Sequence, residues 1–135
     1  MSAKVIRALL VGAPALLAKV PAERIVAGVV KEDTALPALS LTEVSSVPVG
    51  AIDGHAEYSV ITSRVQVMVM VGPGGYPDMK TLVDLVRRAC NFHRGLIAGV
   101  DVISILRDTV GPDLSDVAGN SFQSIDFKVT YYEQN

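Results

Sequence analysis

The segment from Ser63 to Val71 alternates between two kinds of side chain. Valine occupies every second position from 65 to 71, and the positions between carry Arg64, Gln66, Met68 and Met70. Successive side chains of a strand point to opposite faces, so the pattern predicts a β-strand with one apolar face. The other face changes from polar to thioether, and we expect its Met68–Met70 end to be covered and its start to be wet. A fold built on this strand needs a second layer over the valines.

Two helices and four more strands are predicted around it. Apolar residues at helical spacing predict a helix from Ser2 to Val11, then a short turn of helix from Pro14 to Lys19. A second helix is predicted from Pro77 to Phe92, with Gly95 as its stop. The other strands are expected at Arg24 to Val30, Ala38 to Ser46, Val100 to Asp108 and Phe122 to Tyr132.

The order α-β-β-β-α-β-β predicts an α+β fold. We expect an antiparallel or mixed sheet of about four to five strands, with two helices packed on one face. Sequential strands usually lie side by side, so the default topology is a meander broken once by the second helix. The length of 135 residues fits a single domain, residues 1–135.

Two long connectors are rich in polar and turn-forming residues. They run from Val47 to Ser59 and from Thr109 to Ser121, and we expect both to be mobile loops. Loops of this kind carry contacts to other molecules, as does an exposed aromatic residue near a chain end. The candidate interface residues are Arg64, Gln66, Tyr132, Asp53, His55, Asp113 and Asp116.

Charge and composition exclude several classes of protein. The net charge is −2 and no run of Lys or Arg occurs, so the electrostatic footprint of nucleic-acid binding is missing. No segment has the roughly 20 uninterrupted apolar residues of a membrane span, and no membrane partner is expected. Half of the residues are hydrophobic and the mean hydropathy is +0.39, which suggests that some apolar surface is buried between subunits.

No group of residues predicts catalysis or a cofactor. Gly72 to Gly75 precedes a helix, but Tyr76-Pro77-Asp78 replaces the Gly-Lys-Ser/Thr of a phosphate loop, which favours a turn. Neither histidine belongs to a recognisable set of metal ligands. Cys90 falls on the apolar face of its helix, which favours a core position over a reactive thiol. Four carboxylates could be imagined as a cluster but are interpreted as solvated charges: Asp108, Asp113, Asp116 and Glu133.

The whole-chain pattern resembles a known family. The similarity lies in Ile6-Arg7-Ala8-Leu9-Leu10, Ala35-Leu36-Pro37-Ala38-Leu39-Ser40-Leu41, Ser63 to Val67, His93-Arg94-Gly95 with Gly99-Val100, and Phe122 to Tyr131. These segments resemble the small tail-completion proteins of long-tailed bacteriophages and prophages, related to tail-to-head joining and tail-terminator proteins.

This resemblance implies a structural virion protein without catalytic residues or cofactors. Such subunits form a ring, typically a hexamer, at the head-proximal end of the tail tube, where the ring stops tube growth and docks to the head connector. The implied partners are copies of the chain, the tail tube protein and a head completion protein, with DNA only passing through. The implied location is the virion tail, with assembly in the host cytoplasm.

Two other classes remain open at this stage. A small ferredoxin-like domain that binds a ligand or regulates another protein would show a deep pocket with convergent polar groups between sheet and helices. An enzyme would show a cluster of titratable groups with perturbed pKa values.

Overall fold

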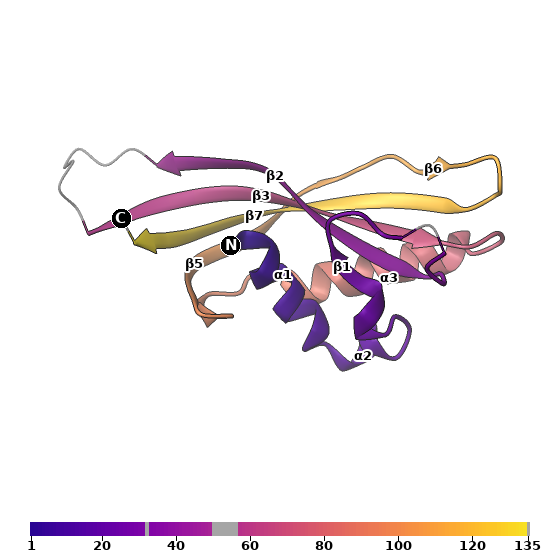
Figure 1. The fold of residues 1–135 in the computed structure, drawn as a ribbon, viewed down its shortest axis with the longest axis horizontal. Helices are drawn as coiled ribbons and strands as arrows, with labels where there is room; N and C mark the ends of the chain where they lie inside the picture. Colours follow the sequence, from indigo (N-terminus) through magenta and orange to yellow (C-terminus); the bar gives the residue numbers. More distant parts are fainter. Residues whose placement is uncertain (32, 50–56, 135) are drawn as a thin grey trace.

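The computed structural model describes residues 1–31, 33–49 and 57–134. Its helices and strands, labelled in Figure 1, are α1 (Ser2–Val11), α2 (Pro14–Leu17), the 3-10 helix η1 (Ala22–Arg24), β1 (Ile25–Ala27), β2 (Ala38–Val49), β3 (Tyr58–Val71), α3 (Tyr76–Cys90), β4 (Gly95–Ile97), β5 (Val100–Val110), β6 (Leu114–Ser115) and β7 (Ser121–Gln134).

All seven strands of the described residues belong to one sheet. Its order is β1-β2-β3-β7-β5-β4, and β6 pairs with β7 beyond the end of β5. The β1–β2 pair is parallel and every other pair is antiparallel. The two longest strands, β3 and β7, therefore lie at the centre and pair with each other from Tyr58↔Gln134 to Val71↔Ser121.

The helices cover one face of this sheet and leave the other face open (Figure 1). Every second side chain from Ile61 to Val71 of β3 and from Gln123 to Tyr131 of β7 points toward the helices and is buried, including Val65 and Phe127. The helices contribute their apolar stripes to the same core, from Val5, Ile6 and Leu10 in α1 and Met79, Leu82 and Val86 in α3. The predicted alternation of β3 is therefore the pattern that places the core.

Each predicted helix and strand is present, but the predicted strand count is too low. β4 has three residues and β6 has two, and segments this short cannot show an alternating pattern in the sequence. The helix expected to reach Phe92 ends at Cys90, since Asn91 has an extended backbone. β1 ends at Ala27 because Gly28 has a φ of +94°.

The predicted meander is wrong in two places. The β1–β2 pair is parallel, whereas a meander is antiparallel throughout. β7, the last strand, inserts between β3 and β5, so these two sequential strands are not neighbours. β3 and β5 run in the same direction on either side of β7, and α3 crosses over between them on the covered face. A gap between two parallel strands accepts one antiparallel strand, which gains a full ladder of hydrogen bonds on each side.

The predicted loop from Val47 to Ser59 is wrong at both of its ends. β2 continues to Val49 and β3 begins at Tyr58, while residues 50–56 lie outside the described part. A β-bulge at Val44, where the register shifts between Glu43 and Ser45, starts an extension of the hairpin. We call this extension the wing, defined as Thr42–Val49 together with Glu57–Thr62.

The connector from Thr109 to Ser121 also contains regular structure that the sequence did not predict. β5 reaches Val110, and Leu114–Ser115 pairs with Ser121–Phe122 as β6.

The turn between β3 and α3 predicts a stability difference between two glycines. Gly74 has a φ of +76°, whereas Gly72 has no positive φ and no atom within 4 Å of an added Cβ. Gly74→Ala should destabilise the fold by about 1–2 kcal/mol, because an L-residue in this backbone conformation is strained. Gly72→Ala should be neutral or stabilising by up to about 1 kcal/mol, since it restricts the unfolded chain. Urea unfolding measures both, and equal midpoints for the two variants would contradict this account of the turn.

Candidate functional site

The uncovered face of the sheet carries two of the predicted interface residues. Arg64 and Gln66 lie on the open side of β3, together with Met68 and Met70. The two methionines are half-buried by their neighbours in the sheet, and no helix lies on their side. The expected contrast between a covered Met68–Met70 end and a wet start is not seen, because Arg64, Gln66, Met68 and Met70 are all half-buried.

Charged side chains from three neighbouring strands gather on the open face. The Arg64 guanidinium lies 2.6 Å from an Asp108 carboxylate oxygen, and the Lys128 ammonium lies 4.0 Å from the other oxygen. Asp126 lies opposite Gln66 in the β3–β7 ladder. Its Oδ1 is buried and has no hydrogen-bond partner among the described residues. Burial raises the pKa of Asp126; the nearby Arg64 lowers it and Asp108 raises it further.

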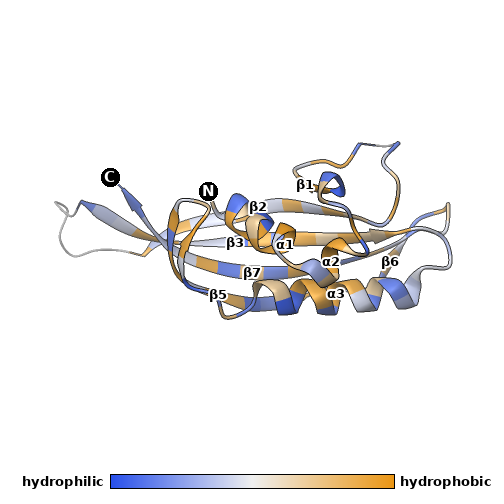
Figure 2. Cartoon of the chain, turned by 90° about the horizontal axis from the view of Figure 1, so that it is seen from below, coloured by the Kyte–Doolittle hydropathy of each residue, from blue (hydrophilic) through white to orange (hydrophobic). Residues whose placement is uncertain are grey.

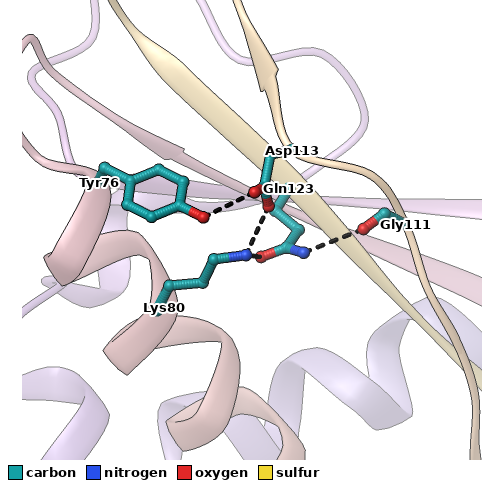
Figure 3. A network of polar contacts seen from close by, with 5 residues as sticks. All are labelled: Tyr76, Lys80, Gly111, Asp113 and Gln123. Atoms are coloured by element: carbon teal, nitrogen blue, oxygen red, sulfur yellow. Dashed lines mark hydrogen bonds and ion pairs between the residues drawn. The ribbon is translucent and has the colours of Figure 1, made fainter.

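Asp113 is held in a polar network at the start of α3 (Figure 3). Its carboxylate accepts hydrogen bonds from the Tyr76 hydroxyl at 2.7 Å and from the Lys80 ammonium at 2.5 Å. Lys80 also donates to Gln123 at 3.0 Å, and Gln123 donates to the carbonyl of Gly111 at 2.9 Å. The hydrogen bond from Lys80 lowers the pKa of Asp113, so the network persists at neutral pH and is lost as pH falls through that lowered pKa.

Asp116 stabilises a tight turn in its own loop. Its Oδ1 accepts hydrogen bonds from the backbone N–H groups of Ala118 and Asn120, both at 3.0 Å. The Asn120 side chain donates to the other oxygen, and this bond is the main reason why the pKa of Asp116 is lowered. Both aspartates of the connector thus have partners within the described subunit. Asp53 and His55, the remaining predicted loop residues, lie outside the described residues.

Tyr132 lines a groove at the end of the sheet where both chain termini lie. The side chain is 44% exposed, and the groove has a volume of about 470 Å³. Its other walls come from Met1, Tyr58, Leu96, Gly99, Val100, Asp101 and Gln134. The groove therefore has a mixed polar and apolar lining that includes two tyrosines, a composition suited to docking of another molecule.

A second exposed surface was missed from the sequence. We call it the basic edge, defined as Phe92–Leu96 and Ile103–Arg107. Phe92 is 80% exposed and Leu96 is 78% exposed. The exposure of Phe92 was not predicted, because the sequence pattern placed this residue at the end of the second helix. The Phe92 φ of +63° instead turns the chain away from the helix.

The backbone at Phe92 is fixed by two hydrogen bonds between residues 91–92 and β5. Its N–H donates to the Ile105 carbonyl at 2.8 Å, and the Arg107 N–H donates to Asn91 Oδ1 at 3.0 Å. The exposed ring therefore projects from an ordered backbone, and its strained φ is held by the surrounding structure.

The sites considered for chemistry do not assemble into a reactive centre in the described residues. Cys90 is fully buried, and burial raises the pKa of its thiol far above the usual range, which makes it unreactive. Within residues 1–31, 33–49 and 57–134, no three His, Cys, Asp or Glu side chains gather as a metal site requires. The described part also has no helix of sufficient length and apolar character to cross a membrane.

Comparisons with known proteins give a family and a similar fold. The model of the family described as "Tail completion protein gp17" matches residues 4–116. The fold is similar to a chain in the solved structure "Virion of native gene transfer agent (GTA) particle", with a TM-score of 0.74 and 13% sequence identity. That similarity covers 98% of this chain and 97% of the other chain. The search of curated proteins found no match.

The raised pKa of Asp126 predicts that the stability of the fold depends on pH. A raised carboxyl pKa in the folded state gives stability that is present at low pH and is lost as pH rises through the folded pKa. Asp126→Asn should therefore raise the urea midpoint at pH 7 and leave it close to wild type at pH 3. Asp101→Asn, an exposed carboxylate on β5, is the control and should shift neither midpoint. A lower midpoint for Asp126→Asn at pH 7 would show that the ionised carboxylate is stabilising.

Gln123 generates a prediction about the connector. Gln123 is 5% exposed and joins α3 to residue 111. Gln123→Leu leaves the Gly111 carbonyl without its donor and removes one acceptor of Lys80, which keeps its bond to Asp113. We expect a loss of about 1–2 kcal/mol in unfolding free energy and faster amide exchange in residues 111–116. Gln66→Leu on the open face should change neither. Unchanged exchange in Gln123→Leu would mean that the network does not hold the connector.

Proposed function

The chain belongs to the tail completion protein gp17 family, whose members are structural proteins of phage tails, and on this premise we propose that it forms a closed ring at the head-proximal end of a tail. The family match over residues 4–116 is the observation that carries the proposal. The ring would end the tail tube and join it to the head, and a hexamer is the expected stoichiometry.

The distribution of exposed apolar side chains supports ring formation. A monomer rarely exposes many large apolar residues on ordered elements, and such surface marks contacts with other molecules. Two groups of them lie near opposite edges of the sheet. They are Val44, Val47 and Val49 on β2, and Phe92, Leu96, Ile103 and Leu106 on the basic edge. Tyr58 of the wing is also exposed, and it lines the same groove as Leu96. Two unlike surfaces near opposite edges of a subunit favour heterologous contacts, which close into a ring when the rotation between copies allows it.

In this proposal, the open face of the sheet and the Tyr132 groove supply the contacts with the tail tube protein and the head completion protein. The ring has one axial side toward the tail tube protein and one toward the head completion protein. The predicted interface residues Arg64, Gln66, Tyr132, Asp113 and Asp116 are candidates for these contacts. The Tyr132 groove is the best formed of them, because it is concave and partly apolar.

The mildly acidic chain suits passage of DNA through the ring. A net charge of −2 gives no general attraction to phosphates, so DNA would cross the lumen without being retained. The proposal asks for no catalytic group and no cofactor, and assembly takes place before the virion is complete, in the host cytoplasm.

The proposal predicts assembly that can be seen directly. The purified chain, alone or mixed with polymerising tail tube protein, should form closed rings in negative-stain images. Rings bound to tubes should sit at one end only, and tubes grown with the chain present should stop elongating. Mass photometry gives the number of copies. A strictly monomeric chain that neither binds tube ends nor changes tube growth would reject the proposed function.

A further inference from the structure

The wing is an acidic and apolar projection on one edge of the sheet. On the side away from β3, the β2 strand has no partner strand beyond Leu41 among the described residues, because β1 pairs only with residues 39–41. Every residue of Thr42–Val49 is exposed. The wing contains Glu43 and Glu57 and no lysine or arginine. Glu43 lies 3.9 Å from the N-terminal ammonium of Met1 and accepts a hydrogen bond from Ser63 at 3.4 Å, so Glu57 is the wing carboxylate without an ion pair in the described subunit. The described wing therefore offers apolar side chains flanked by negative charge.

The basic edge lies toward the β5–β4 edge of the sheet, opposite the β2 strand of the wing, while Tyr58 of the wing and Leu96 of the basic edge line one groove. Figure 2 shows β2 along one side and β5 along the other, with α3 beside β5. The basic edge contains His93, Arg94 and Arg107 and no acidic residue, while Asp101 lies just beyond it, opposite Leu96. In the part of the chain that the structure describes, neither guanidinium forms an ion pair within the subunit. The charges of this edge are therefore available to a partner.

We propose that the wing of one copy packs against the basic edge of the next copy, with its valines on Phe92 and Leu96 and its glutamates near Arg94 and Arg107. This inference rests on the ring proposed above and names the contact that builds it. The two surfaces match in apolar character and have opposite charge, which both attracts the correct partner and disfavours contact between like surfaces.

In this proposal the contact is made by side chains, because few backbone N–H and C=O groups on either surface are free to form hydrogen bonds with a partner strand. Pro48 lacks an N–H, so the outer part of β2 cannot donate a complete row of hydrogen bonds. On the basic edge, the Ile105 carbonyl and the Arg107 N–H already bond to Phe92 and Asn91. Addition of a β-strand is therefore obstructed on both sides, and packing of exposed apolar side chains remains.

Charge reversal tests the proposal in the full-length chain. One variant carries Arg94→Glu and Arg107→Glu on the basic edge, and a second carries Glu43→Lys and Glu57→Lys on the wing. Each variant alone brings like charges together at every contact, so its assembled fraction should fall about tenfold or more at equal concentration. The matched control is Lys4→Glu with Lys19→Glu, two exposed lysines of the helical side outside both surfaces, which should assemble as wild type does. Urea midpoints check that all variants fold.

Mixing the two variants supplies the decisive measurement. In a ring that alternates the two variants, each acidic wing meets an unchanged basic edge, and each reversed, basic wing meets a reversed, acidic edge. Every contact then joins opposite charges, so a 1:1 mixture should recover assembly to within about twofold of wild type. Recovery requires an even number of copies, and mass photometry of the mixed rings reports that number directly.

The outcomes separate this contact from the proposed function. If the folded variants assemble as well as wild type, or if the mixture does not recover, the wing and the basic edge do not meet and this inference is rejected while rings of the wild type remain. If only binding to tube ends is lost, the wing is occupied by the tube protein and the inference also fails. If the wild type forms no ring with or without tube protein, the proposed function itself falls.

Discussion

Burial of one face of two long central strands is the constraint on which the rest of the structure depends. Alternate residues of β3 and β7, such as Val65, Val67 and Phe127, are removed from water by α1 and α3. Each such side chain contributes about 1.5–3 kcal/mol when fully buried. Each of these strands has 14 residues and is longer than the layer of helices that covers it (Figure 1). The ends and edges of the sheet therefore project beyond the core.

The projecting parts are also the parts that suit assembly. The wing has no helix beneath it and exposes valines that nothing in the described subunit covers. The basic edge is different, because its backbone is fixed by two hydrogen bonds, one from the Phe92 N–H to the Ile105 carbonyl and one from the Arg107 N–H to Asn91 Oδ1. In the proposed ring, a subunit of this kind would combine a stable centre with surfaces that become buried only on assembly. The proposal would then account for the high mean hydropathy of the chain, +0.39, without a larger core.

Much of the fold and part of the candidate site could be predicted from the sequence. The strands around Val67 and Phe127 and the helices around Leu10 and Val86 follow from local periodicity, which depends only on near neighbours. The exposure of Tyr132 was predicted because this residue follows Tyr131 in the strand and so points to the other face of the sheet. Phe92 was not identified, because its exposure depends on a left-handed backbone that hydrogen bonds to β5 hold in place. The partners of Asp113 could not be inferred either, since Tyr76 and Lys80 come from another element.

The sequence by itself determined which residues form strands and helices and which face of each is apolar, because side-chain periods of 2 and 3.6 residues are local properties. Only the tertiary structure decided that β7 lies between β3 and β5, and that the β2 strand of the acidic wing and the basic edge lie toward opposite edges of the sheet. Strand order depends on contacts between residues far apart in the chain. Many orders satisfy the same local pattern, and packing of the whole core selects one of them.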